Sequence, residues 1–316
     1  MRLIGIDIGG TKCSVVTGDE NCAVFEKTKI ETTDCRSTLD KIYAAVKSAG
    51  NADFIGISCG GPLDEAAGII KSPPNLPGWD DVHICRELEE LTGVGCAIKN
   101  DADACAVAEW QSGAGKGCRN MVFLTFGTGM GAGLILNGEP YHGKGGNAGE
   151  VGHIRLARTG PVGYHKAGSF EGFCSGGGIK QQGQEAARRL FSRGLPGPLY
   201  CRTEAELQSV SAKTVAEAAR KGDAAAKRIF VNVGRRLGEG IAVIIDMLDP
   251  EAIVIGGIYP RCRDLLDGGI SASVKKEALP FSSRGCRILP SYHGEAIGDA
   301  AALAVACYEA RKRKIQ

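Results

Sequence analysis

The pattern of apolar and polar positions near the start of the chain predicts three strands. Each run is rich in β-branched residues and ends at a turn-like sequence, first Gly9-Gly10 and then GDEN (18–21). Short turns between successive runs indicate a three-stranded meander. The runs are RLIGIDIGG (2–10), TKCSVVTG (11–18) and CAVFEKTKIET (22–32).

The apolar spacing then changes to the period of a helix. Residues 37–50 present one apolar face, and Ser37 is a suitable N-cap. Strands and helices alternate from there, with one long loop after residue 59. The predicted elements are a strand at 53–59, a helix at 82–93, a strand at 96–100 and a helix at 101–115.

The same pattern begins again at Met121. Three strand-like runs follow one another, and Asn137-Gly138 is a strong hairpin turn. A meander followed by alternating helices and strands, used twice, predicts two α/β domains with a cleft between them, where small ligands bind. The predicted elements are strands at 121–126, 131–136, 139–142, 252–257 and 286–292, and helices at 176–191, 211–222, 223–247, 264–278 and from Glu295.

Composition narrows the classes of function. The 316 residues are 43% hydrophobic, which is enough for two cores, and the formal net charge of +2 argues against nucleic-acid binding. The basic residues 311–314 are interpreted as a solvated helix end. No apolar run approaches the roughly 20 residues of a membrane span, and Asp7 interrupts the apolar start, which excludes a signal peptide.

The 13 cysteines do not suggest a disulfide framework. Their number is odd, and no two form CxC or CxxC. Several, such as Cys59 and Cys96, lie in apolar strands, where a thiol behaves as a small hydrophobic group. We therefore expect a reducing, cytoplasmic location.

Three glycine-rich turns are candidate nucleotide contacts. In DIGGTK, Gly9 and Gly10 allow backbone N–H groups to approach a phosphate, while Thr11 adds a hydroxyl and Lys12 a cation. FGTGMGAG formally matches the dinucleotide pattern, but a strand follows it where that pattern requires a helix. In AIVIGG a buried strand meets Gly256-Gly257, and a simple strand-to-loop turn remains an alternative.

A candidate general base follows the predicted strand at 96–100. Asp101 would begin a helix directly after the strand, which places its carboxylate at the cleft. The alternative is that Asp101 or Asn100 only caps that helix, although NDAD offers three capping residues where one suffices.

The segment GEVGH pairs Glu150 with His153 on irregular backbone. A Glu-x-x-His pair on a helix can bind a metal, but the glycines around this one oppose a helix. A carboxylate and an imidazole are also suitable partners for the adjacent hydroxyls of a sugar.

In this order, the motifs resemble those of the ROK sugar kinases, which belong to the actin-like ATPase superfamily, over nearly the full length. DIGGTK and FGTGMGAG resemble the two phosphate motifs, and VIGG the adenosine motif. The sugar-site segments are similar to SPPNLPGW (72–79), NDADA (100–104) and GEVGH (149–153). The chain begins at the first phosphate strand, so we expect no helix-turn-helix like that of the family's repressors.

The resemblance implies an α/β fold of two actin-like (ribonuclease H-like) lobes with mixed sheets around a central cleft. The small lobe would comprise residues 1–118 with the helix 295–316 packing back on it, and the large lobe residues 119–294. It also implies a cytoplasmic homodimer that uses ATP and Mg²⁺ to phosphorylate a hexose or aminohexose, usually at the 6-hydroxyl. Glucose is the first expectation and N-acetylmannosamine the second.

The resemblance also assigns roles to residues. Asp101 would be the base, and Asp7 would hold Mg²⁺, since that ion takes few carboxylates and relies on substrate phosphates. A turn role is the alternative for Gly61 and Asn75. The sugar ligands would be Gly61, Asn75, Asn100, Asp101, Glu150, His153 and Glu171, and the nucleotide contacts Asp7, Gly9, Gly10, Thr11, Lys12, Gly127, Thr128, Gly129, Gly256 and Gly257.

One segment departs from the family pattern. Many relatives bind zinc through this histidine and three cysteines, whose positions here hold Val162, Tyr164 and Ser169. Even with His165 and Cys174 as substitutes, His153 would lie in a site one ligand short of tetrahedral. We therefore expect no structural zinc, and a loop shaped by turn glycines and anchored by Tyr164, Phe170 and Phe173.

Two other classes of protein remain possible. A sugar-sensing regulator without catalysis would need no general base at Asp101. An actin-like assembly ATPase would need no sugar segments.

Overall fold

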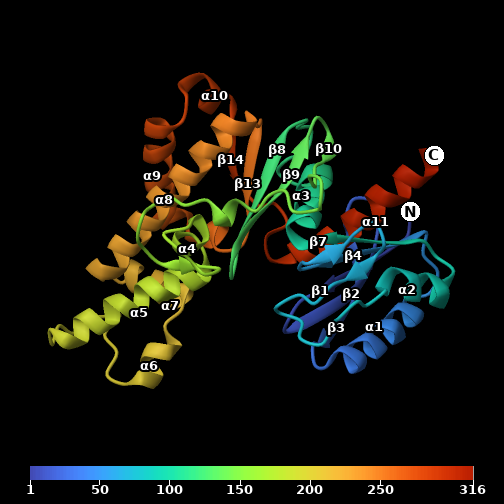
Figure 1. Ribbon diagram of the computed structural model, residues 1–316, viewed down its shortest axis with the longest axis horizontal. Coiled ribbons are helices and arrows are strands. Elements are labelled where there is room, and N and C mark those ends of the chain that lie inside the picture. Colours follow the sequence, from blue (N-terminus) through green and yellow to red (C-terminus); the bar gives the residue numbers. More distant parts are fainter. Residues whose placement is uncertain (316) are drawn as a thin grey trace. The chain divides into compact units, whose positions relative to one another are not determined.

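The computed structural model describes residues 1–315, which form two compact units (Figure 1). The first unit comprises Met1–Phe123, Gly133–Ala148 and the chain from Ser291 onward, and the second comprises Leu124–Ala132 and Gly149–Pro290. Gln316, the last residue of the predicted C-terminal helix, lies outside the described residues. The domain boundaries expected after residues 118 and 294 stay a prediction.

The first sheet confirms the five strands expected in the N-terminal part of the chain. Its order is β3-β2-β1-β4-β7, with β1 antiparallel to β2 and parallel to β4, and β4 parallel to β7. The strands are β1 (Leu3–Ile8), β2 (Lys12–Gly18), β3 (Val24–Glu31), β4 (Phe54–Cys59) and β7 (Cys96–Asn100).

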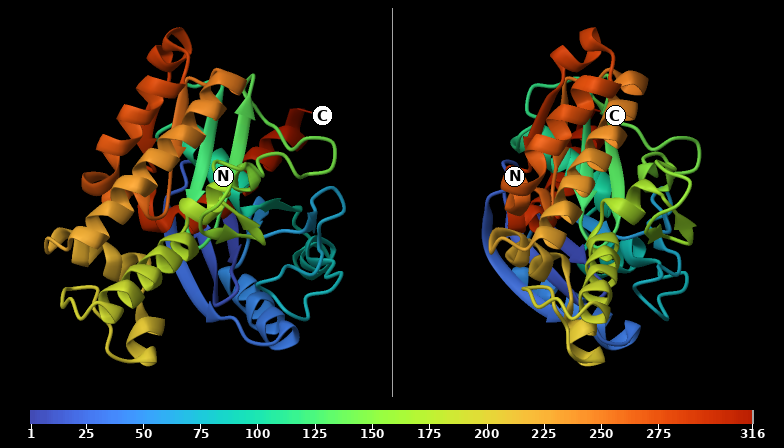
Figure 2. Two further views of the ribbon diagram at one scale, coloured as in Figure 1. Left: turned by 60° about the vertical axis from the view of Figure 1, so that its left-hand side comes forward. Right: turned by 90° about the vertical axis from the view of Figure 1, so that its left-hand side faces the viewer.

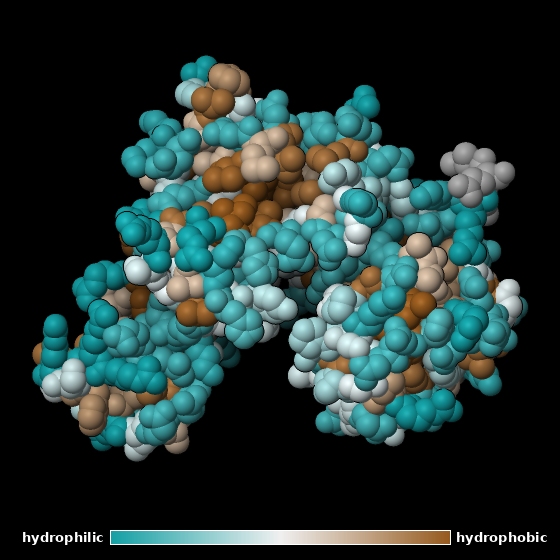
Figure 3. All heavy atoms as spheres, in the orientation of Figure 1, coloured by the Kyte–Doolittle hydropathy of each residue, from teal (hydrophilic) through white to brown (hydrophobic). Residues whose placement is uncertain are grey.

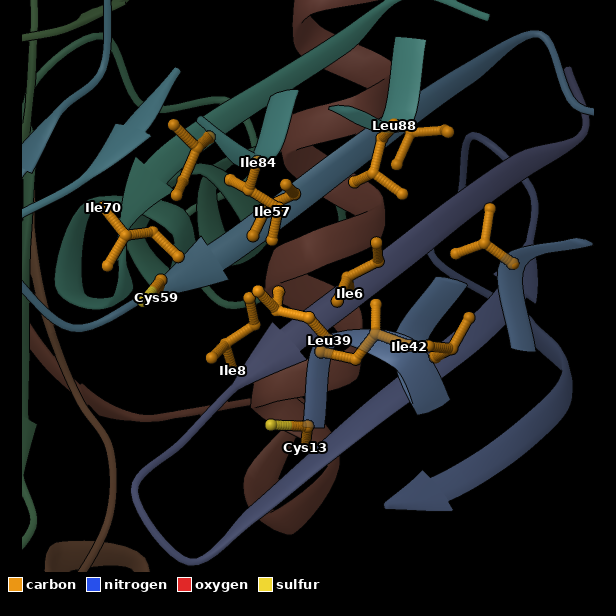
Figure 4. Close-up of a cluster of buried hydrophobic side chains, with 14 of the residues drawn as sticks. Ile6, Ile8, Cys13, Leu39, Ile42, Ile57, Cys59, Ile70, Ile84 and Leu88 are labelled. Carbon is orange, nitrogen blue, oxygen red and sulfur yellow. The ribbon is translucent and has the colours of Figure 1, made fainter. Parts of the chain in front are cut away.

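The main core of the first unit lies between this sheet and two helices, α1 (Cys35–Ala49) and α2 (Ile84–Thr92). Figure 4 shows side chains of the sheet and of both helices meeting in it. The prediction of Ser37 as the N-cap of α1 was wrong. Asp34 is the N-cap and accepts a hydrogen bond from the Ser37 N–H, so the helix begins two residues earlier than Ser37.

The other helices of the first unit are α3 (Asp101–Ser112) and α11 (Ile297–Ile315), which follows the short turn η2 (Gly294–Ala296). α11 packs directly on the backbone of β1 and β4. A Cβ at Gly56 would lie 2.2 Å from the Ala302 carbonyl oxygen, so only glycine permits this contact. The predicted long loop contains a small hairpin of β5 (Leu63–Asp64) and β6 (Ile69–Ile70).

The second five-stranded sheet repeats the arrangement of the first. Its order, β10-β9-β8-β13-β14, again places the meander on one side and two later strands on the other. The predicted strand at 139–142 is shorter than expected. The strands are β8 (Met121–Phe126), β9 (Met130–Leu136), β10 (Glu139–Pro140), β13 (Ala252–Ile255) and β14 (Arg287–Pro290).

Two long helices, α8 (Ala224–Leu248) and α9 (Tyr259–Glu277), lie side by side in the second unit (Figure 2). Gly234 permits this, because a Cβ there would lie 2.7 Å from the Leu266 carbonyl oxygen. α9 begins before the predicted residue 264, and its backbone is non-helical at Cys262. Figure 3 shows apolar residues on the surface over the C-terminal half of α8, where Met247 is 72% exposed.

The remaining elements of the second unit are short, apart from two helices that match the predicted ones. Most were not predicted, because two to six residues show no recognisable period. They are η1 (Val151–His153), β11 (Val162–Gly163), β12 (Lys166–Ala167), α4 (Phe170–Phe173), α5 (Gly176–Ser192), α6 (Glu204–Ser209), α7 (Ala212–Arg220) and α10 (Pro280–Gly285).

Within the described part of the chain, every helix is too short or too polar to cross a membrane. All thirteen cysteines lie in that part and are free thiols.

Candidate functional site

Three neighbouring parallel strands bring several candidate residues of the first unit to one edge. Asp7 lies near the end of β1, Gly61 follows β4, and Asn100 ends β7. The register pairs Asp7 with Ser58 and Cys59 with Asn100, so these strand ends are level. Ligands of open α/β sheets bind beyond the carboxyl ends of the strands, where these residues lie.

The DIGGTK turn joins this edge through its glycines. The Gly9 N–H donates to the Lys12 carbonyl oxygen at 3.1 Å. A Cβ at Gly10 would lie 2.4 Å from the Asn75 carbonyl oxygen, which makes glycine necessary and places Asn75 beside the turn. Thr11 is exposed, as is Lys12, so both remain available to a ligand.

Asp7 is surrounded by negative charge. Burial and, after it, the carboxylates of Asp299 and Asp101 together raise the pKa of its carboxyl from 3.8 to about 6, against the opposite effect of Lys27. Asp299 accepts hydrogen bonds from Ser14 Oγ and Lys27 Nζ. This electrostatic environment suits a bound cation.

Asn100 and Asp101 form the junction of β7 and α3. Asn100 is the N-cap, and its side chain accepts from the Ala102 N–H at 3.0 Å. Since Asn100 performs the capping, Asp101 is not needed for it. Asp101 is exposed, yet desolvation by the surrounding protein raises the pKa of its carboxyl, against a hydrogen bond from the Ala102 N–H.

The FGTGMG turn of the second unit is held by backbone contacts. The amides at the start of α5 donate to it, Gly176 N to the Gly127 oxygen at 2.7 Å and Gly177 N to the Thr128 oxygen at 3.3 Å. Gly257, with φ +66°, packs so closely that a Cβ would lie 3.1 Å from the Gly127 nitrogen. The structure therefore brings the predicted phosphate turn and the Gly256-Gly257 turn together, with Thr128 exposed.

The GEVGH segment packs on the start of β9 through its two glycines. A Cβ at Gly149 would lie 2.0 Å from the Ala132 oxygen, and one at Gly152 2.2 Å from the Met130 oxygen. Glu171 reaches the same strand and accepts from the Met130 N–H at 3.0 Å. Since a Cβ at Gly152 would also lie 3.3 Å from the Glu171 Cβ, Glu171 lies next to the segment that carries Glu150 and His153.

The loop after His153 is anchored differently from the prediction. Phe170 and Phe173 are buried, as expected, but Tyr164 is 65% exposed, so its predicted role as a buried anchor was wrong. Its ring meets the His153 ring edge-on at 5.2 Å, and Lys166 Nζ donates to the His153 carbonyl oxygen. The Tyr164 ring therefore packs against His153, a candidate sugar-binding residue, while the two phenylalanines lie in the core.

In the part of the chain that the structure describes, potential metal ligands do not gather around His153. Among residues 1–315, the group of His, Cys, Asp and Glu side chains close enough to hold an ion is Glu65, Asp103 and His142. Cys174 is buried, its thiol pKa is raised well above the ordinary value by desolvation, and it donates to the Val233 carbonyl oxygen. The absence of structural zinc stays a prediction.

Two residues of this edge were not found from the sequence. Glu65 accepts the Asn100 N–H at 2.9 Å, and Asp299 faces Asp7 from the start of α11. The only local signal for Glu65 was its place in the segment after Gly61.

A family model described as the ROK family matches residues 3–307. The chain belongs to the ROK family.

Among its relatives, a glucokinase of Thermotoga maritima is 30% identical over 287 residues, which cover 89% of each chain. A ROK family glucokinase from Streptomyces griseus, solved in complex with glucose and AMPPNP, aligns with a TM-score of 0.77 at 28% identity, covering 97% of this chain and 99% of that one. A transcriptional regulator of Escherichia coli, NagC, is 29% identical over 75% of this chain and 57% of its own length. These matches confirm the predicted two-lobe actin-like fold of ROK proteins.

Proposed function

We propose that this ROK protein is an ATP-dependent kinase that phosphorylates the 6-hydroxyl of a hexose or aminohexose, with glucose first and N-acetylmannosamine second. The observation that carries the proposal is the β7–α3 junction. There, Asp101, which is not the N-cap of α3, is exposed at the carboxyl ends of the parallel strands β1, β4 and β7, beside Asn100 and Gly61. The similarity to glucokinases supports the same reading.

Asp101 is the general base of this proposal. Phosphoryl transfer requires positioning and charge neutralisation, and a sugar hydroxyl also needs a group that accepts its proton. Desolvation raises the Asp101 pKa above its ordinary value, which strengthens the carboxylate as a base.

The nucleotide contacts are divided between glycine turns. The backbone amides of Gly10 and Thr11 are assigned to phosphate oxygens, and Lys12 adds positive charge. Gly9 shapes the turn, since its N–H donates to the Lys12 carbonyl oxygen. Gly127, Thr128 and Gly129 supply the second phosphate turn. Gly257, which is exposed and packs against that turn, and the buried Gly256 before it are assigned to the adenosine.

Asp7 fits a role in holding Mg²⁺ through water. The charges of Asp7, Asp101 and Asp299 around one strand end favour a divalent cation there. When bound, Mg²⁺ neutralises phosphate charge during transfer.

The sugar ligands come from two sets of residues. Gly61, Asn75, Asn100 and Asp101 form the set of the first unit. Glu150, His153 and Glu171 form the set of the second, where the Gly149 and Gly152 contacts fix the segment on β9.

His153→Ala is expected to raise the sugar KM at least about tenfold, because one partner of the sugar hydroxyls is lost. The ATP KM should stay within about twofold, since His153 is assigned no nucleotide contact. Steady-state kinetics with each substrate varied in turn measures both. A parallel rise of the two constants would contradict the assignment to sugar.

Exhaustive chelation is expected to leave activity and the thermal midpoint unchanged once Mg²⁺ is restored. The physical reason is that the Cys174 thiol lies in the core, where it donates a hydrogen bond to the backbone. In addition, none of the three positions that hold zinc-binding cysteines in many relatives holds a cysteine here. Metal analysis of the purified protein should find well under one zinc per chain. Stoichiometric zinc, or activity that Mg²⁺ alone does not restore, would contradict this.

The second candidate is a sugar-sensing regulator without catalysis, which the similarity to NagC supports. It would bind sugar without sugar-dependent ATP turnover. An assembly ATPase is disfavoured by the similarity to glucokinases along the chain.

The protein is further proposed to be a cytoplasmic homodimer that binds neither nucleic acid nor membrane. Light scattering of the purified protein measures its mass and so tests the homodimer.

A further inference from the structure

A network of charged side chains lies behind the proposed base in the first unit. Glu65, Lys99, Asp103 and His142 are at most 26% exposed, and they come from the β5–β6 hairpin, β7, α3 and the segment after β10. None of the roles assigned above uses any of the four. Their contacts nevertheless reach Asn100 at the β7–α3 junction, and Glu65 itself lies four residues after Gly61.

Glu65 connects the Gly61 segment to the β7–α3 junction. Its Oε1 accepts the Asn100 N–H at 2.9 Å, and its Oε2 lies 3.6 Å from Lys99 Nζ. A Cβ at Gly61 would be 3.4 Å from Asn100 Nδ2, so the two segments also touch directly. Glu65 therefore fixes the backbone of Asn100, and with it the start of the helix that carries Asp101.

His142 connects the same junction to the glycine-rich loop that leads to Glu150. Its Nδ1 lies 2.8 Å from Asp103 Oδ2, and its Nε2 lies 3.5 Å from Lys99 Nζ. Because an ammonium only donates, the network assigns the proton to Nδ1, which donates to Asp103. The His142 carbonyl oxygen accepts the Ala148 N–H at 3.1 Å, which closes the loop 142–148.

Lys99 makes this a positioning network and not a vacant cation site. Its ammonium, in a side chain only 8% exposed, also pairs with Glu309 at 3.2 Å. It already supplies the positive charge that a metal ion would otherwise bring to Glu65, Asp103 and His142. The four side chains pair with one another through hydrogen bonds and ion pairs. These contacts hold the β7–α3 junction and the loop 142–148 in place.

We propose that His142 is a positioning residue for the sugar, acting with Asp103, Glu65 and Lys99 to hold Asn100–Asp101 and the loop 142–148 in their binding geometry. This rests on the proposed function. It predicts an effect on sugar and not on nucleotide, because no described contact of the network reaches the 9–12, 127–129 or 256–257 turns.

The test is the kinetics of His142→Leu with sugar and ATP varied separately. The sugar KM should rise about tenfold or more, the factor associated with one lost hydrogen bond, while the ATP KM stays within about twofold. His142→Gln, whose amide can still donate to Asp103, should recover part of the loss. His293→Leu is the matched control. His293 contacts Ser112 Oγ at 3.0 Å on α3, the helix that carries Asp103, but it lies outside the network.

Should His142→Leu fail to fold, Glu65→Gln replaces it. The amide oxygen keeps an acceptor for the Asn100 N–H and removes the charge that faces Lys99, so the same selective rise in sugar KM is expected. Thermal midpoints of every variant establish folding.

Three results would overturn the inference. They are an unchanged sugar KM in a folded variant, a parallel rise of both constants, and calorimetric binding of one Mn²⁺ or Zn²⁺ that His142→Leu abolishes. An inactive wild-type protein would contradict the proposed function itself. An active wild type beside an unaffected variant would contradict only the role of His142.

Discussion

Asp101→Asn is expected to lower turnover by about 10²–10⁴-fold, the range typical of a lost general base, and to retain sugar binding. The amide keeps the size of the side chain and can still accept the Ala102 N–H, so α3 should form unchanged. Only the ability to take the hydroxyl proton is removed. Single-turnover kinetics measures the chemical step, and calorimetry measures the sugar affinity.

Asp40→Asn is the matched control for that variant. Asp40 lies on α1, is 55% exposed and pairs with the exposed Arg36 at 3.3 Å, so its loss should leave turnover unchanged. Near-normal turnover of a folded Asp101→Asn protein would show that another group accepts the proton.

Asp7→Asn is expected to abolish most activity while stabilising the protein free of ligands at neutral pH. The folded-state pKa of about 6 lies above the unfolded value of 3.8, so the folded protein holds the proton more tightly. Raising the pH through this window therefore destabilises the wild type, by up to about 3 kcal/mol above pH 6. Asparagine cannot ionise and escapes this penalty.

The measurement is urea unfolding of both proteins without Mg²⁺ or ATP, at pH 7.5 and near pH 4. The stability advantage of Asp7→Asn should be present at the higher pH and should shrink as the pH falls toward 4. A variant that is less stable than the wild type at pH 7.5 would show that the carboxylate is a structural group. It would also remove the electrostatic argument for a cation beside Asp7.

The sequence predicted the parts of the fold whose residues repeat a local pattern. The strand at Ala252–Ile255 is an unbroken apolar run, and the strand at Leu3–Ile8 is interrupted only by Gly5 and Asp7. The long helix ending at Leu248 has a clear period. The hairpin Leu63–Ile70 was missed because its strands are two residues long. The start of α1 was misplaced because Asp34 and Ser37 are both good caps, and only the geometry distinguishes them.

The places of the candidate site residues in the fold were predictable where a motif lies at the end of a strand, as for Asp7 and Asn100. Asp299 and Glu65 were not, since their role depends on contacts with chain segments far away in sequence. Tyr164 shows the opposite error. An aromatic residue between glycines was taken as a buried anchor, yet the positive φ of 38° at this residue turns the chain so that the ring lies on the surface against His153.

The central claim is tested most directly by ADP formation measured in a coupled assay with ATP, Mg²⁺ and a panel of hexoses and N-acetylhexosamines. We predict sugar-dependent ADP formation with the highest kcat/KM for glucose, and ³¹P NMR should identify the product as the 6-phosphate. Binding of sugar and ATP without sugar-dependent ADP formation for any member of the panel would contradict the kinase assignment and favour a regulator.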